Sequence, residues 1–427
     1  MKSKVFKNAS WIIGCKLVKA FLMLIVTMIS ARYLGPSNYG LISYAASLIA
    51  FVTPIMKLGL ESTLVYEIVN NPLKEGKIVG TSIVMNFLSG ILCLIGVCTF
   101  TFFVNAGETE TLIICALYGI SLLFQALEMI QYWFQSKLLS KYSAMSMLIS
   151  YIIVSILQVV ILLTNKNLHL FCLTYSLDFL LIAIFLLVIY KNKGTQKLSF
   201  SFKIGKKMLN KSKYYIISTM MVTIFAQTDK IMLKMMLDNS SVGYYTAGNT
   251  CATMFAFVFA AILDSFRPIV FEAKKKSNEA FQDQMKKLYS ILIYFSLLIC
   301  LLSTIFSPLI IKIMYGKEYS LAIPVLRVVV WYTTFSYLGS ARNIWVMAEE
   351  KQKYLWIMNL SGAIINIILN LILIPVYNIV GAAIASLITQ IFTNIIIGFI
   401  IKPIRENNKL MIQALNIRNL KNIFFSQ

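Results

Sequence analysis

Charge is scarce in this chain, and acidic charge is the scarcest. Only 13% of its 427 residues are charged, with 17 Asp and Glu against 39 Lys and Arg, whereas 59% are hydrophobic and the mean hydropathy is +0.77. A soluble protein of this size needs a more polar surface. Apolar stretches of about 20 residues recur along the chain, and each is long enough to cross a bilayer. The sequence therefore predicts an all-α integral membrane protein.

Residues that build metal sites, disulfide frameworks and active sites are also few. The single histidine, His169, cannot form a metal site alone, and the seven cysteines lie in apolar stretches without a Cys-x-x-Cys pair. We interpret these cysteines as small buried hydrophobic residues. The sequence has no Gly-x-x-x-x-Gly-Lys-Ser/Thr phosphate-binding loop and no zinc-protease or serine-hydrolase motif. We therefore expect a protein that is not an enzyme and that needs no metal or cofactor.

The apolar stretches predict twelve transmembrane spans, six on each side of a lysine-rich connection. This pattern predicts an N-terminal lobe over residues 1–190, a basic cytoplasmic linker over 191–213, a C-terminal lobe over 214–401 and a cytoplasmic tail over 402–427. The predicted spans are 11–31, 41–64, 78–104, 111–134, 142–164, 168–190, 214–237, 243–271, 288–311, 321–347, 354–374 and 379–401.

The formal net charge of +22 is distributed unevenly between the loops. Of the 39 Lys and Arg residues, 27 lie in one set of alternate loops and termini and only 4 in the other set. Cytoplasmic loops of membrane proteins carry this excess, so both termini are predicted to be cytoplasmic. The basic charge thus reports topology and attraction to anionic membrane lipids, and we expect no nucleic-acid partner.

The two halves of the chain resemble each other at one place. Segments 34–40 and 237–243 share Leu, Ser and Gly at the same three positions, each just before the second span of its half. Repeats that enter the membrane in the same orientation are related by an axis along the membrane normal. We therefore expect two pseudo-symmetric six-helix lobes with a substrate path between them.

Ionisable residues inside spans are costly, so each is a candidate for function. Lys16 and Lys19 are three positions apart and share one helix face, so we expect them to face a wet cavity or an anion. The alternative is that Lys16 pairs with an acid such as Asp178. Lysine and arginine suit a phosphate-bearing substrate, and acids beside them could bind a coupling H⁺ or Na⁺. The candidate cavity cations within the spans are Lys16, Lys19, Lys230, Arg267, Arg327 and Arg342, and the candidate coupling acids are Asp178, Asp229 and Glu61.

Several short motifs, in order along the chain, resemble the polysaccharide (O-antigen) flippases of the multidrug/oligosaccharidyl-lipid/polysaccharide exporter superfamily. Tyr66 departs from the pattern, because that family often has a basic residue there. The motifs are Ala31–Gly40 followed by Leu41–Ala46, Leu58–Leu60 with Glu67–Ile68, Thr228–Leu233, Tyr315–Tyr319 through Arg327, and Ile379–Ile384.

This resemblance implies a MATE-like fold with a central cavity between the lobes. It implies a flippase that moves undecaprenyl-pyrophosphate-linked oligosaccharide repeat units, of O-antigen or another surface polysaccharide, across the bacterial cytoplasmic (inner) membrane. A polysaccharide polymerase and chain-length proteins would be partners. The family roles map by motif onto Arg32, Asp229 and Lys230, with Arg32 a further cavity cation.

Two other functions compete with this interpretation. The first is a cation-coupled multidrug efflux transporter of the same superfamily, although the surplus of positive charge within the spans disfavours cationic drugs. The second is a membrane glycan polymerase or ligase, which would need a substantial extracytoplasmic loop that the span pattern does not contain.

Overall fold

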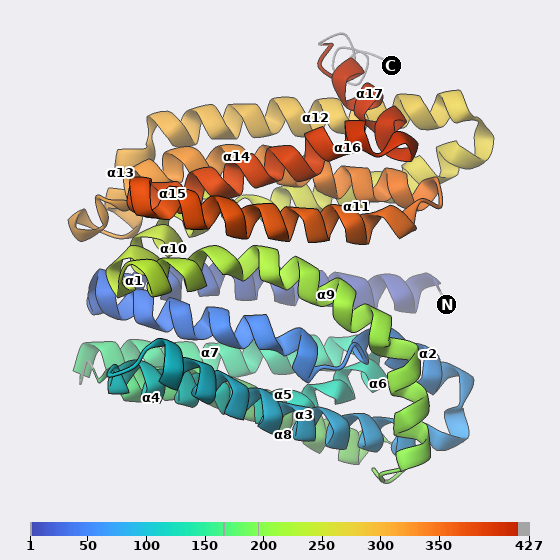
Figure 1. The fold of residues 1–427 in the computed structure, drawn as a ribbon. Helices are drawn as coiled ribbons and strands as arrows, with labels where there is room; N and C mark the ends of the chain where they lie inside the picture. The colour runs from blue at the N-terminus through green and yellow to red at the C-terminus, as the bar shows by residue number, and fades with distance from the viewer. Residues whose placement is uncertain (1, 165–166, 195, 417–427) are drawn as a thin grey trace. The chain divides into compact units, whose positions relative to one another are not determined.

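The computed structural model describes residues 2–164, 167–194 and 196–416, and within these ranges every regular element is a helix (Figure 1). Helices satisfy all backbone hydrogen bonds within one segment, as a bilayer interior requires. The α-helices are α1 (Lys2–Met56), α2 (Glu61–Asn70), α3 (Glu75–Val104), α4 (Thr109–Gly119), α5 (Ser121–Gln125), α6 (Ile130–Ser136), α7 (Ser140–Thr164), α8 (Leu168–Lys193), α9 (Phe202–Met236), α10 (Asn239–Thr253), α11 (Ala256–Lys276), α12 (Asn278–Ile305), α13 (Ser307–Met314), α14 (Ala322–Ala348), α15 (Leu355–Ile391), α16 (Ile397–Ile400) and α17 (Arg405–Gln413). The 3₁₀ turns are η1 (Pro72–Lys74), η2 (Ala126–Met129), η3 (Lys317–Tyr319), η4 (Gln352–Tyr354) and η6 (Lys402–Ile404), and η5 (Phe392–Ile396) is a π-helix.

The prediction of a multi-pass all-α membrane protein is confirmed. Among the described residues, eight helical stretches are long and apolar enough to span a membrane, or nine if α10 and α11, bent by 41°, count as one. Two of these stretches, 11–56 and 352–400, have 46 and 49 residues, enough for two crossings each. They are interrupted at Gly35 (φ 72°) and Asn378 (φ 52°). Nine stretches, of which two are long enough for two crossings each, correspond to eleven spans. The 27-residue helix α14 corresponds to the twelfth predicted span.

Several predicted spans differ from the structure: 243–271 is divided between α10 and α11, 288–311 is divided between α12 and α13, and two further differences lie in the first half of the chain. The span predicted over 41–64 ends at Met56, because Leu58 and Gly59 adopt left-handed backbone conformations that break the helix before α2. The span predicted over 111–134 is divided into α4, α5, η2 and α6. Hydropathy averaged over a whole span does not resolve either break, because the few charged and polar residues there, such as Lys57, Glu61 and Glu128, are surrounded by apolar ones.

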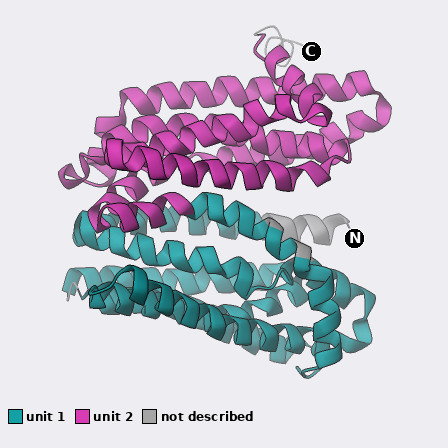
Figure 2. Ribbon diagram, viewed as in Figure 1, with its two compact units in different colours: residues 1–227 teal, residues 228–427 magenta. Residues whose placement is uncertain are grey.

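The chain divides into two compact units, residues 1–227 and residues 228–427 (Figure 2). In unit 1, α1 packs along α7 and against α3 and α4, and α7 packs against α8. One hydrophobic core of this unit contains Trp133, Phe134 and Tyr190. In unit 2, α14 packs against α10, α12 and α15, around a core that includes Tyr289 and Trp345. The division falls within α9, so this helix belongs to both units.

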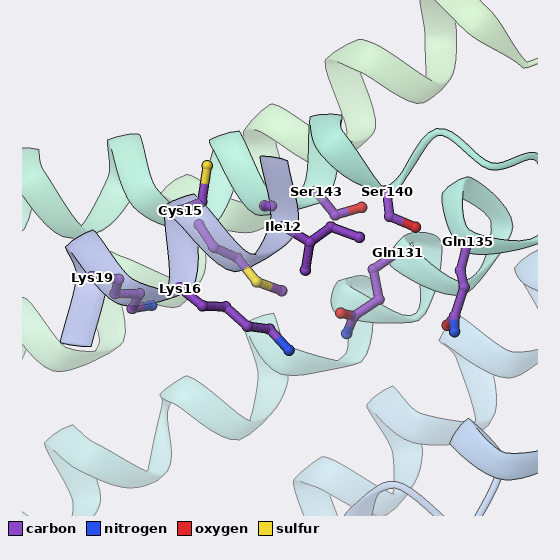
Figure 3. Close-up of a pocket in the computed structure, with 10 residues that line it drawn as sticks. Ile12, Cys15, Lys16, Lys19, Gln131, Gln135, Ser140 and Ser143 are labelled. Atoms are coloured by element: carbon purple, nitrogen blue, oxygen red, sulfur yellow. The ribbon is translucent and has the colours of Figure 1, made fainter. Parts of the chain in front are cut away.

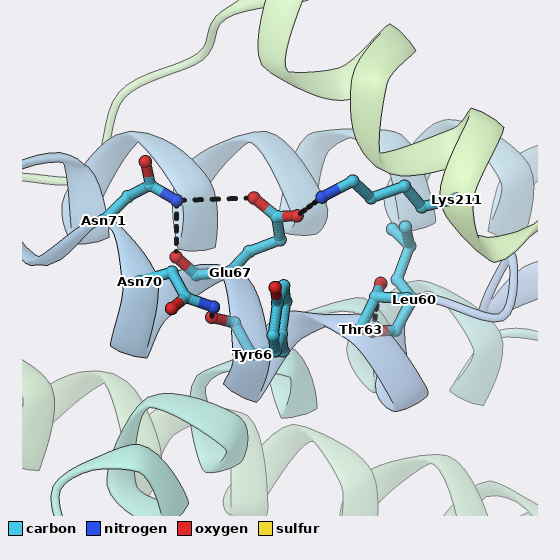
Figure 4. A network of polar contacts seen from close by, with 7 residues as sticks. All are labelled: Leu60, Thr63, Tyr66, Glu67, Asn70, Asn71 and Lys211. Atoms are coloured by element: carbon cyan, nitrogen blue, oxygen red, sulfur yellow. Dashed lines mark hydrogen bonds and ion pairs between the residues drawn. The ribbon is translucent and has the colours of Figure 1, made fainter.

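The basic segment predicted as a linker over 191–213 is anchored to unit 1 at several points. The backbone N–H of Ser201 donates to the Thr81 hydroxyl (3.0 Å), and that of Gly76 donates to the Gln196 side chain (3.0 Å). The Lys211 ammonium donates to Glu67, whose other oxygen lies 3.4 Å from the Asn71 amide (Figure 4). The lobe boundaries proposed from the sequence remain a prediction. Residues 417–427 of the predicted tail (402–427) lie outside the described residues.

The carboxylate of Glu67 is the buried centre of this attachment. Its side chain is almost completely buried, whereas that of Lys211 is 42% exposed. The hydrogen bond to Glu67 raises the pKa of the Lys211 ammonium above its ordinary value of 10.5. The Lys211 ammonium also lies 5.6 Å from the centre of the Tyr66 ring. The first turns of α9 are therefore held to α2 by the ion pair between Lys211 and Glu67.

Candidate functional site

A pocket in unit 1 contains both lysines that the sequence places on one helix face (Figure 3). It has a volume of about 220 Å³ and lies between α1, α6 and α7. We call it the cationic pocket. Lys16 is exposed and Lys19 is partly buried, and both belong to α1. The lining residues are Ile12, Cys15, Lys16, Lys19, Gln131, Gln135, Ser140, Ser143, Ala144 and Met147.

The polar groups of the cationic pocket are mostly hydrogen-bond donors. None of its ten described lining residues is acidic, and two ammonium groups stand beside two amides and two hydroxyls. The hydroxyl oxygen of Ser143 is buried and has no hydrogen-bond partner among the described residues. Buried polar groups are normally paired, so an unpaired hydroxyl at the wall of a pocket favours a polar ligand there. The chemistry of this pocket suits an anion.

Asp178 faces Lys19 and is not paired with Lys16. Its Oδ2 lies 4.0 Å from the Lys19 ammonium, and its Oδ1 accepts a 2.6 Å hydrogen bond from the Ser150 hydroxyl. The Lys19 ammonium also lies 5.1 Å from the centre of the Tyr151 ring. No carboxylate in the described residues is within ion-pair distance of Lys16. The alternative in which Lys16 pairs with Asp178 is therefore not what the structure contains.

Lys19 also lines a second, larger pocket of about 400 Å³ in the same unit. We call it the aromatic pocket. It is enclosed by the two halves of α1 on either side of Gly35, together with α4, α7 and α8. Its lining includes four tyrosines, two phenylalanines and the polar groups of Ser30, Gln158 and Asp178. Because Lys19 lines both pockets, they are direct neighbours.

Glu61, a predicted coupling acid, is part of a separate polar cluster. It accepts hydrogen bonds from the Lys57 ammonium (2.7 Å) and the Tyr132 hydroxyl (2.8 Å). Glu128 is buried within electrostatic range of Lys57 and Lys19. Glu128 is not among the three predicted coupling acids, although a carboxylate in an apolar span is itself a signal of function.

Asp229 is the most thoroughly hydrogen-bonded acid among the described residues of unit 2. Its side chain is 5% exposed, and it accepts bonds from the amides of Asn366 (3.1 Å) and Asn370 (2.7 Å) and from the hydroxyls of Tyr245 and Ser386. Four neutral donors therefore hold this carboxylate, and no ion pair joins it to the adjacent Lys230 within the described chain. We call these five residues the Asp229 cluster.

A reversal of direction in α15 assembles the Asp229 cluster. Asn370 and Ser386 lie on opposite sides of the kink at Asn378, and both reach Asp229. The two arms meet so closely that a Cβ atom on Gly381 would lie 2.2 Å from the Leu373 carbonyl oxygen. Only glycine fits such a close approach.

The remaining predicted cations do not line the cationic pocket. Arg267 is exposed and pairs with Asp264 at 3.5 Å, and the Arg327 Nε donates to the Ser307 hydroxyl at 2.9 Å. Arg342 is buried and donates to the carbonyl of Thr393, a residue of the π-helix η5, at 2.6 Å. Lys230 is partly exposed on α9, and Arg32 is exposed on α1 three residues before its kink.

Comparison with known families decides the family of the chain. A profile described as "Polysaccharide biosynthesis protein" matches residues 5–274, more than half of the sequence. The chain belongs to this family. A second profile, MatE, matches residues 215–372. A search of curated protein sequences gave no match.

Solved structures of two kinds of transporter share the fold of this chain. The lipid II flippase MurJ, in an inward closed conformation, superposes with a TM-score of 0.72 at 18% identity, over 97% of this chain and 92% of the other. An inward-facing multidrug resistance MATE transporter of the MOP superfamily superposes with a TM-score of 0.68 at 13% identity, over 92% and 96%. The predicted family resemblance and the MATE-like fold are confirmed.

Proposed function

We propose that this protein is a flippase that moves undecaprenyl-pyrophosphate-linked oligosaccharide repeat units across the bacterial cytoplasmic membrane by alternating access. The observation that carries the proposal is the cationic pocket between α1, α6 and α7. There Lys16 and Lys19 line a space that is rich in hydrogen-bond donors and has no acidic lining residue. The likeness of the fold to a structure named as a lipid II flippase supports it. The substrate glycan is O-antigen or another surface polysaccharide, both termini are cytoplasmic, and the protein itself catalyses no chemical step.

The cost of moving the substrate explains why such a pocket is needed. A diphosphate with attached sugars cannot enter hydrocarbon alone, because its charges and hydroxyl groups lose their water. Lysine ammonium groups, amide donors and hydroxyls can replace that hydration. The prenyl chain can remain in the lipid meanwhile, since it is apolar.

The Asp229 cluster is proposed as the coupling site, with H⁺ or Na⁺ as the coupling ion. A buried carboxylate can take a proton, and half-turn rotations of the Asn366 and Asn370 amides would present oxygens that suit a hard cation. The amide oxygen of Asn370 is buried and has no hydrogen-bond partner in the described chain, which fits this second use. Asp178 and Glu61 remain alternative coupling acids.

Cation-coupled multidrug efflux is the competing function, and the match to the MatE profile over residues 215–372 favours it. A cationic drug would be repelled by Lys16 and Lys19, because the lining of the cationic pocket contains no acidic residue. The single nearby carboxylate, Asp178, does not balance the charge of two ammonium groups. The electrostatics therefore favour an anionic substrate. A polysaccharide polymerase and chain-length proteins would then act on the exported units.

Deletion of the gene tests the proposal. We expect loss of surface polysaccharide and accumulation of prenyl-diphosphate-linked units on the cytoplasmic side, restored by the wild-type gene. Lys16→Ala with Lys19→Ala should fail to restore export at normal membrane levels. Lys276→Ala, which removes a lysine that is 70% exposed, is the matched control and should restore it. Normal surface glycan with altered drug tolerance would instead establish efflux.

A further inference from the structure

The aromatic pocket combines flat rings with polar groups that have no partner. Tyr118 and Tyr175 stack with their ring centres 4.3 Å apart, and Phe179 packs edge-to-face on Tyr175 at 5.3 Å. At about 400 Å³, the pocket falls in the range of about 300–1,000 Å³ that is usual for small-molecule sites. Most of its lining is apolar, with a few polar side chains, which is also the usual composition of such sites.

Two side chains of this pocket have hydrogen-bonding capacity that the protein leaves unused. The hydroxyl of Ser30, on a side chain only 5% exposed, has no hydrogen-bond partner in the described chain. Gln158 donates its amide to Thr174 (2.9 Å), and its carbonyl oxygen accepts no bond from the described residues. A buried polar group without a partner costs about 1–3 kcal/mol, so the Ser30 hydroxyl indicates a ligand that completes it. The Gln158 side chain is partly exposed, so its free oxygen can bind the same ligand.

The spacing of Lys19 and Asp178 points to a ligand that carries hydroxyl groups. Their charged atoms are 4.0 Å apart, which is too far for a direct hydrogen bond. Both residues line the aromatic pocket. A hydroxyl placed between them can accept from the ammonium and donate to the carboxylate at once, whereas an ether or a hydrocarbon cannot do both.

We propose that the aromatic pocket is a sugar-binding subsite, in which one ring of the transported glycan lies against the tyrosines while the adjoining phosphate occupies the cationic pocket. This inference rests on the proposed flippase function and deepens it. A pyranose has apolar C–H faces that pack on aromatic rings and hydroxyl edges that need hydrogen bonds. Lys19, which lines both pockets, contacts the sugar and the phosphate together.

Other occupants fit the aromatic pocket less well. A prenyl or acyl chain would cover the apolar rings but would leave Ser30, Lys19 and Asp178 without hydration. A cationic drug would gain from the rings and Asp178 but would meet the Lys19 ammonium 4.0 Å from that carboxylate. A sugar uses the rings, the charged pair and the unpaired groups together.

The test compares two lipids on purified protein in nanodiscs. The first is the native lipid-linked oligosaccharide, extracted from cells that lack this gene. The second is undecaprenyl diphosphate without sugar. Wild-type protein should bind the glycosylated lipid at least about tenfold more tightly, the equivalent of one or more hydrogen bonds. Ser30→Ala and Gln158→Leu should each remove most of this preference and leave binding of the sugar-free lipid unchanged.

Controls and contrary outcomes separate the two proposals. Ser82→Ala removes a buried hydroxyl of unit 1 that donates to the Val79 backbone and lines neither pocket, so it should keep the preference. Lys16→Ala should weaken both lipids. Equal affinity of wild-type protein for both lipids, or variants that weaken both equally, would overturn the sugar subsite alone. Binding of neither lipid, with binding of drug cations, would overturn the flippase function as well.

Discussion

The carboxylate of Asp229 should be a major stabilising group of unit 2. Two donors bind each of its oxygens: the Asn366 and Asn370 amides bind Oδ1, and the Tyr245 and Ser386 hydroxyls bind Oδ2. Asp229→Asn keeps the shape, removes the charge and replaces one acceptor oxygen by a donor. The Asn366 and Asn370 amides keep an acceptor oxygen, and the two hydroxyls can rotate to accept from the new amide, so all four bonds become bonds between neutral groups. A hydrogen bond to a charged group contributes about 1.5–3 kcal/mol, whereas one between neutral groups contributes about 0.5–1.5 kcal/mol. We expect a loss of about 3–6 kcal/mol.

Thermal unfolding of the purified protein in detergent measures this effect. For a unit of about 200 residues, 1 kcal/mol corresponds to roughly 2–4 °C, so the Tm should fall by at least about 6 °C. Asp264→Asn is the matched control, because that carboxylate is 70% exposed and its loss should change stability by less than about 0.5 kcal/mol. If both variants unfold at the same temperature as wild type, the four hydrogen bonds to Asp229 do not stabilise unit 2 and the reasoning is refuted.

The remaining predictions concern the attachment of α9 to unit 1. Gly59→Ala should destabilise the protein by more than about 2 kcal/mol, because Gly59 has φ 62° and a Cβ atom there would lie 2.7 Å from the Ser212 carbonyl oxygen. The control is Gly96→Ala, which has open space around its Cβ and should leave the Tm unchanged in the same thermal assay. Lys211→Met should lower Tm by a constant amount from neutral pH up to about 10.5, the ordinary lysine pKa. At higher pH the difference from wild type should vanish, because the stabilisation by the Lys211 ammonium is lost as the pH rises through its raised pKa. A difference that persists at higher pH would mean that packing, and not the ion pair with Glu67, links α9 to α2.

Some features of the fold and site follow directly from the sequence. Hydropathy and lysine distribution predict the helical membrane fold, because a bilayer interior admits few alternatives to apolar helices. The three-residue spacing of Lys16 and Lys19 predicts that they share a face, and the structure places both in one pocket. Asp229 was selected because a carboxylate in a span is expensive.

The partners of these residues could not be predicted in the same way. Ser386 is 157 positions from Asp229 in the sequence and reaches it only because α15 reverses at Asn378. Asn366 and Asn370 carry a weak signal, as two amides four positions apart on one face of an apolar span. Ser30 and the stacked tyrosines resemble ordinary packing residues in the sequence, and only their position around one pocket distinguishes them.

Direct observation of lipid transfer tests the central claim most sharply. The wild-type protein would be reconstituted in proteoliposomes that carry the native lipid-linked oligosaccharide in both leaflets, and an added glycosidase or lectin would report the fraction that reaches the outer leaflet. We predict that wild-type protein makes the protected half accessible, and that the double variant Lys16→Ala, Lys19→Ala does so no faster than protein-free vesicles. Transfer by the double variant at the wild-type rate would contradict the account.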